Sequence, residues 1–142
     1  MNSNKKTTGI MLDVRITLAA LWIAGMLASL NGDTYRLSDP DALKALLANA
    51  GPIVATPGLY LIMSIIFVVP IFMSVLTLTL KYPVSRGANR ILGILYGIFI
   101  LVFWVIPLVL RSPGYAIVWS TAQLVFALLV VWYAWKWPNP EG

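Results

Sequence analysis

Four windows of about twenty apolar residues constrain this chain more than any other feature. They lie at about residues 10–30, 59–80, 91–110 and 116–135, and a helix needs roughly 20 such residues to cross the hydrocarbon of a bilayer. Hydrophobic residues make up 60% of the sequence and charged residues only 11%, too few for the surface of a soluble domain. The sequence therefore predicts an all-α polytopic membrane protein, a single domain over residues 1–142 that forms a four-transmembrane-helix bundle. We interpret the first window as an uncleaved span, because it is longer than the apolar core of a signal peptide.

A short amphipathic helix is expected between the first two spans, over about residues 39–50. Ser38 or Asp39 suits its N-cap, Pro40 its first turn, and Gly51 the stop after its end. One face of this helix is apolar because the spacing i, i+3, i+4, i+7 brings together Leu43, Leu46, Leu47 and Ala50. Such a helix is typical of the membrane interface.

The basic residues predict how the bundle is oriented. An even number of spans places both termini on one side, and seven basic residues fall on that side: Lys5, Lys6, Arg15, Lys81, Arg86, Arg90 and Lys136. Three fall on the other: Arg36, Lys44 and Arg111. Since cytoplasmic segments collect Lys and Arg, we expect cytoplasmic termini and a single cytoplasmic loop, KYPVSRGANR at residues 81–90. The loop is expected to contact anionic lipid headgroups. The alternative is a substrate phosphate site at Asn89 and Arg90, where a helix begins.

The composition excludes several classes of chemistry. The chain has no Cys and no His, which removes disulfides, thiol nucleophiles, Cys or His zinc sites and His-dependent catalytic triads. We therefore expect no metal, no cofactor and no enzymatic activity. The net charge of +5 comes without any nucleic-acid-binding motif, so no nucleic-acid partner is expected.

Small residues predict where helices approach closely. In a bilayer, helices associate through backbone proximity, which Gly and Ala allow. The third span carries Gly93 and Gly97 as GxxxG, and the first carries Ala20, Ala24 and Ala28 at the same spacing. We expect these two spans to pack together, although the same motif is compatible with a dimer contact.

Prolines and aromatic residues mark other places along the spans. Pro70 and Pro107 each remove a backbone hydrogen bond and predict bends, either as ordinary features of membrane helices or as the lining of a cavity. The stretch WYAWKWP that ends the fourth span predicts an aromatic belt at the inner interface.

Polar residues near the outer ends of the spans form one candidate ligand site. The group consists of Asn31, Asp33, Tyr35, Arg36, Trp104 and Gln123. Gln123 lies about two turns inside the fourth span, so its amide is expected to face the bundle interior and meet a partner. Convergence of this group on one outward-facing pocket is our hypothesis.

A second polar group lies near the inner ends of the spans. It consists of Asp13, Arg15, Asn89 and Arg90. Asp13 and Arg15 are two positions apart and point to different sides of a helix, so Asp13 is expected to pair with Arg90 across helices. A structural ion pair is favoured here over a proton or ion path.

Several short motifs resemble a known family. They are Leu21–Trp22, NGD at residues 31–33, Asn89–Arg90 followed by Gly93 and Tyr96, and VWYAWKWP at residues 131–138. Together they resemble an uncharacterised family of small bacterial four-helix membrane proteins, which implies the four-span fold and a bacterial inner membrane but no activity. In that family's pattern an acidic residue often occupies the middle of the fourth span, where this chain has Gln123. The difference argues against a role that needs a titrating carboxylate there.

Three classes of function remain open on this sequence. The favoured one is a non-catalytic membrane protein, either a small homo-oligomer or an accessory subunit of a larger membrane complex. The alternative is a carrier or channel for a small solute or ion that uses the outer polar group. A membrane enzyme acting on lipid or quinone is the least favoured, because Asp13 and Asp33 have no recognisable catalytic partner.

Overall fold

The computed structural model describes the backbone of residues 2–50, 54 and 56–138, and the side chains of the same ranges from residue 13 onward. Its helices in chain order are α1 (Asn2–Ser38), α2 (Pro40–Leu47), α3 (Pro57–Thr79), α4 (Tyr82–Val109) and α5 (Gly114–Lys136). All except α2 are long and apolar enough to cross a membrane. The expected all-α fold with four spans and a short helix between the first two is confirmed.

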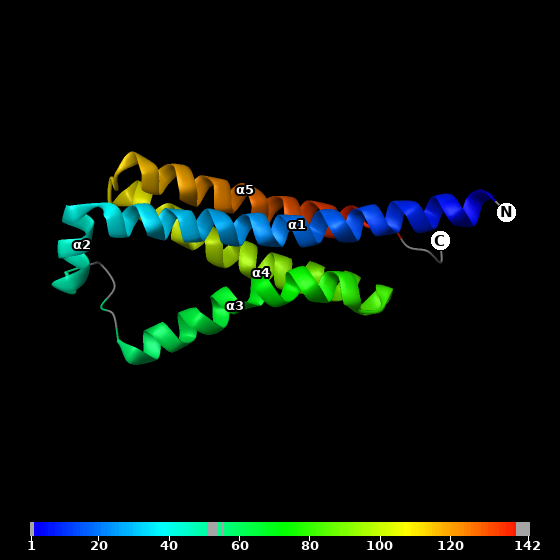
Figure 1. Ribbon diagram of the computed structural model, residues 1–142, viewed down its shortest axis with the longest axis horizontal. Coiled ribbons are helices and arrows are strands. Elements are labelled where there is room, and N and C mark those ends of the chain that lie inside the picture. Colours follow the sequence, from blue (N-terminus) through cyan, green and yellow to red (C-terminus); the bar gives the residue numbers. More distant parts are fainter. Residues whose placement is uncertain (1, 51–53, 55, 139–142) are drawn as a thin grey trace.

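The four long helices run along one axis, with both termini at one end and α2 lying crosswise at the other (Figure 1). We call these the inner end and the outer end. Helix α1 packs against α5 and α3, and α4 packs against the same two helices. Among the described residues, α1 and α4 are therefore diagonal partners, which touch through long side chains such as Trp22 and Tyr96.

The core fills the middle and inner part of the bundle. Its buried side chains are Leu18, Trp22, Met73, Tyr96, Ile100, Leu124, Ala127, Val130, Ala134 and Trp137. Most large apolar side chains outside this core are exposed, as lipid-facing positions of a membrane protein should be.

Helix α3 is packed over only half of its length. All four of its buried residues, Pro70, Met73, Ser74 and Thr77, lie in the half that ends at the inner end. Toward its first residue the helix diverges from the other three (Figure 1). Pro70 and Pro107, where bends were expected, both lie inside continuous helices.

Helix α1 is longer than the predicted first span, because it continues through the NGD stretch to Ser38. Polar side chains in this extension bond to the carbonyl one turn back. Asn31 Nδ2 donates to Leu27 O at 2.8 Å, and the Thr34 hydroxyl donates to Leu30 O at 2.8 Å. These hydrogen bonds give the polar side chains partners within α1, and the helix can therefore continue through this polar stretch.

The prediction that residues 81–90 form a loop is wrong. Only Leu80 and Lys81 separate α3 from α4, and the rest of this stretch forms the first turns of α4, with a proline in the first turn. The basic residues Arg86 and Arg90 are thus held on a helix instead of a loop. Their places on that helix decide what they contact.

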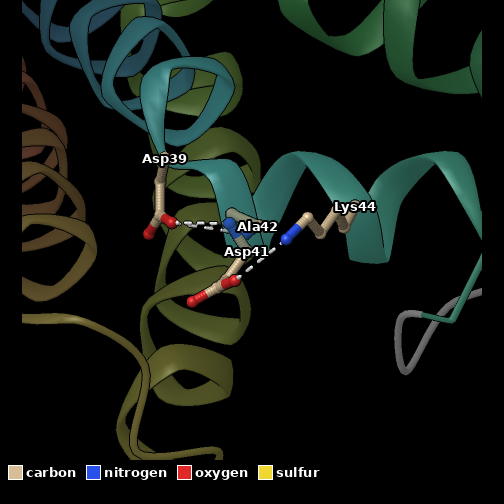
Figure 2. A network of polar contacts seen from close by, with 4 residues as sticks. All are labelled: Asp39, Asp41, Ala42 and Lys44. Carbon is tan, nitrogen blue, oxygen red and sulfur yellow. Dashed lines mark hydrogen bonds and ion pairs between the residues drawn. The ribbon is translucent and has the colours of Figure 1, made fainter.

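Helix α2 begins as predicted, with Asp39 as its N-cap and Pro40 in its first turn. Asp39 Oδ1 accepts from the backbone N–H groups of Asp41 at 3.0 Å and Ala42 at 3.4 Å (Figure 2). The helix ends earlier than expected, because Asn49 adopts a left-handed conformation with φ of 49°. The stop proposed at Gly51 lies outside the described residues.

The glycines of α4 face a different neighbour from the one predicted. A Cβ atom added at Gly93 would lie 3.2 Å from Val130 Cγ1, and one at Gly97 would lie 3.8 Å from Val131 Cγ2. Both valines belong to α5. On α1, Ala28 is buried but Ala20 is exposed, so the alanine row does not form the seam with α4. The prediction that Gly93 and Gly97 allow close approach of another helix is confirmed, but that helix is α5 and not α1. Which helix lies next to α4 depends on the tertiary arrangement.

We predict that Gly93→Val destabilises the bundle, because Val130 leaves no room for the added atoms. Overpacking of this kind costs about 1–3 kcal/mol. Gly87→Val is the matched control, since a Cβ at Gly87 would have no neighbour within 4 Å apart from its adjacent residues and its own helix backbone. Thermal unfolding in one detergent should show a lower midpoint for the Gly93 variant than for the Gly87 variant, and equal midpoints would contradict the packing described here.

Candidate functional site

The amide of Asn89 is the centre of a buried polar cluster near the inner end. Asn89 is fully buried on α4. Its Oδ1 accepts from the indole Nε1 of Trp22 on α1 at 2.8 Å, and its Nδ2 donates to the Thr77 hydroxyl on α3 at 3.0 Å. A second hydrogen bond runs from Nδ2 to Ser85 O at 2.9 Å within α4. One side chain therefore joins three helices.

The partners of Asn89 are themselves satisfied. The Thr77 hydroxyl donates to Met73 O at 2.6 Å, and the Ser85 hydroxyl donates to Thr77 O at 3.0 Å. Both Thr77 and Ser85 are fully buried. Buried polar groups in lipid are stable only with such partners, so the cluster holds the α3–α4 hairpin in one register.

Arg15 fastens α1 to the end of α3. Its Nε donates to Thr77 O at 2.8 Å, and its Nη2 donates to Leu78 O and Leu80 O, each at 2.6 Å. The last carbonyls of a helix lack internal partners and carry partial negative charge, which favours a cation there by about 0.3–1 kcal/mol or more when partly buried.

Arg90 joins α4 to the end of α5 in the same way. Its Nε donates to Ala134 O and its Nη2 to Trp135 O, both at 3.0 Å, and its guanidinium lies 5.1 Å from the centroid of the Trp135 ring. The expected Asp13–Arg90 pair does not form. Asp13 is exposed on α1, and the described side chains include no ion-pair partner for it.

An aromatic contact extends the cluster toward the middle of the bundle. The Tyr96 ring packs against Trp22 with 5.5 Å between centroids, and the Tyr96 hydroxyl accepts from Gln123 Nε2 at 3.2 Å. Gln123 thus has the partner that its depth in the span requires. That partner is a tyrosine of α4, and it is not a member of the outer polar group that was expected to meet Gln123.

The outer polar residues do not converge on one pocket. Asn31 bonds to its own helix, and Asp33 pairs with Arg36 at 3.5 Å, with both side chains more than half exposed. Tyr35 stacks on Trp119 of α5 at 6.0 Å. Trp104 Nε1 donates to the Thr121 hydroxyl at 2.9 Å. Each group is engaged locally, so the geometry gives no support to a shared ligand site.

Asp39 links α2 to α5 at the outer end. Its Oδ2 accepts from the Tyr115 hydroxyl at 2.9 Å. This hydrogen bond, followed by those from the N–H groups of Asp41 and Ala42, lowers the pKa of Asp39 below its ordinary value of 3.8. The carboxylate is therefore ionised throughout the neutral range and holds α2 against the start of α5.

The members of the inner cluster are an amide, an indole, two hydroxyls and two guanidiniums, and each of them bonds to another member or to a backbone carbonyl. Within the described ranges, no three His, Cys, Asp or Glu side chains lie together as a metal ion would require.

Sequence reasoning found Asn89, Arg15 and Arg90 but missed Trp22, Thr77 and Ser85. A signal for two of them was present. Thr77 lies three residues before and Ser85 four residues after the Leu80–Lys81 connection, so an antiparallel hairpin brings them to similar depths. Trp22 carried no comparable signal, because its partner depends on the rotation of α1.

We predict that Asn89→Leu destabilises the protein by about 1–3 kcal/mol, because Trp22 and Thr77 lose a buried partner. Asn31→Leu is the same change at an exposed residue that bonds only to its own helix. Equilibrium unfolding of both variants in mixed detergent micelles checks the difference, and equal stabilities would show that the cluster contributes nothing.

We further predict that Tyr115→Phe raises the pKa of Asp39 toward 3.8, since the strongest stabiliser of the carboxylate is removed. A lowered pKa contributes stability above the ordinary value that is lost as the pH falls through the folded value. NMR titration of the Asp39 carboxyl carbon measures this shift. Tyr133→Phe is the control, and the same midpoint in both variants would rule out the Tyr115 contact.

Comparison with known proteins identifies the family of this chain. No curated protein and no solved structure matches the chain. The sequence profile of the family of unknown function DUF6326 matches residues 12–141, which include all the described helices apart from the start of α1. The chain, a four-span membrane protein, therefore belongs to the DUF6326 family.

Proposed function

We propose that this protein is a non-catalytic membrane protein that acts as a small homo-oligomer, associating through the outer half of α3. The observation that carries the proposal is the uneven packing of that helix. Within Pro57–Thr79, every buried residue lies at or after Pro70. Two turns or more of an apolar helix thus remain without a protein neighbour of their own.

The chemistry of this half-helix suits another helix. The span from Pro57 to Thr79 has no charged residue, and the exposed Ser64 hydroxyl donates to Tyr60 O at 2.7 Å. Leu61 and Ile65 follow each other at i, i+4 and are both exposed. A second copy offers the same uncharged surface, so a two-fold contact would bury it without electrostatic cost.

The interior supports a role without catalysis. The buried Asn89, Thr77 and Ser85 side chains all bond to one another or to backbone, and Arg15 and Arg90 are bound to helix ends. A carrier would need polar groups left free to hold a solute, and the outer group that was expected to do so is engaged locally. The geometry therefore favours assembly over transport.

We also propose the bacterial cytoplasmic membrane as the location, with both termini in the cytoplasm. The two termini lie at the same end of the bundle (Figure 1). Seven of the ten basic residues fall on that side, which the preference of cytoplasmic segments for Lys and Arg supports.

Native mass spectrometry of the protein, released from its own membranes in mild detergent, tests the assembly. We expect a homo-oligomer that dissociates in Ile65→Trp, because a bulky ring would disrupt close helix packing. Leu95→Trp on α4 is the matched control, since Ile65 and Leu95 are each 59% exposed. A monomeric wild type would contradict the proposal, and a different membrane protein at fixed ratio would replace it with an accessory-subunit role.

A further inference from the structure

Two buried donors at the inner end lack an acceptor. They are the indole Nε1 of Trp137, a residue that is only 1% exposed, and the guanidinium Nε of Arg86. An indole N–H can only donate, and a guanidinium cannot be deprotonated in a protein. Leaving such groups buried and unpaired is costly, so the structure calls for an acceptor at each of them.

The two donors lie at the same corner of the bundle, where α4 begins and α5 ends. Tyr82, Arg86 and Arg90 follow one another at i, i+4 and i+8 on one face of α4. At one end of this row, the Tyr82 ring meets Trp137 edge-on at 5.3 Å, and the Tyr82 hydroxyl donates to Pro138 O. At the other end, Arg90 binds the last carbonyls of α5. Arg86 is the middle member of this row, so its position on α4 lies between these two contacts.

The electrostatics of the corner favour an anion. The carbonyls that end α5 would repel negative charge, but Arg90 already binds those of Ala134 and Trp135. Arg86 itself has no ion pair or hydrogen bond among the described residues, so its positive charge is free to act on a ligand.

A single partner for both donors would accept at least two hydrogen bonds, and the unpaired charge of Arg86 favours a negative one. A cation or a hydrogen-bond donor does not fit, since both orphaned atoms are donors. A phosphate group has several acceptor oxygens on one centre and pairs well with the planar fork of an arginine. We propose that the corner between the start of α4 and the end of α5 is a phosphate-binding site, with Arg86 and Trp137 as its two donors.

This site does not depend on the assembly proposed above, because all of its residues come from one chain. It also differs from a general attraction of basic residues to a membrane surface. Lys81 contributes only charge from an exposed position, whereas Arg86 and Trp137 contribute oriented, buried N–H groups. The difference between the two kinds of residue gives the experiment its controls.

The test measures phosphate binding by the purified full chain in detergent, with two probes. One is phosphatidylglycerol, followed by native mass spectrometry as retained lipid, and the other is inorganic phosphate, followed by calorimetry. Arg86→Gln should weaken binding of the recognised probe about tenfold, the usual effect of losing one charged hydrogen bond. Arg86→Lys should also weaken it, because lysine keeps the charge but loses the oriented Nε. Lys81→Gln, which removes one charge outside the site, should stay within about twofold of wild type.

The two probes separate the sources of the phosphate. Tight binding of the lipid alone identifies a headgroup site, and tight binding of inorganic phosphate identifies a site for a free phosphate compound; each outcome supports the proposal. Binding of neither probe would overturn it and leave water as the acceptor. Equal losses in Lys81→Gln and Arg86→Gln, or full binding by Arg86→Lys, would overturn it in favour of unspecific charge attraction.

Trp137→Phe gives a second route if the Arg86 variants do not fold. It removes the indole N–H while keeping an aromatic ring against Tyr82. We expect weaker phosphate binding with the helical circular dichroism of the wild type. Unchanged binding in this variant would remove Trp137 from the site and overturn the two-donor arrangement.

Discussion

The buried amide of Asn89 is the constraint on which the inner half of the bundle depends. In lipid, helices gain no hydrophobic stabilisation from touching one another, so packing and a few polar contacts must choose their arrangement. Asn89 bonds to Trp22 on α1 and to Thr77 on α3. Sliding or rotating either helix would leave donors without partners in a medium that offers none. The register of three helices therefore follows from one side chain.

The basic residues have a second role beyond setting orientation. Arg15 and Arg90 reach across to the ends of α3 and α5, where unpaired carbonyls carry negative partial charge. Each stabilises a helix end and joins two helices at once. Arg86 belongs to the same row as Arg90 but has no such carbonyl, and this difference separates a structural arginine from one that is free to bind a ligand.

The two ends of the bundle are built differently. At the inner end, polar contacts close the α3–α4 hairpin, and Trp137 at the end of α5 packs edge-on against Tyr82 of α4. At the outer end, α2 is tied to α5 through Asp39 and Tyr115, while α3 diverges from its neighbours (Figure 1). The buried residues of α3 all lie at or after Pro70, and the assembly that we propose rests on the exposed half of the helix that precedes it.

The sequence by itself determined the all-α class, the four spans and the Asp39 cap of α2, because these depend on local apolar length and local hydrogen bonds. It also placed Asn89 in the inner polar group and predicted that Gln123 meets a partner. The tertiary structure alone decided which helices meet: Gly93 faces α5 instead of α1, and Arg90 binds carbonyls instead of Asp13. Helix rotation and neighbour order cause these differences, since they arise from packing among distant segments that no local pattern encodes.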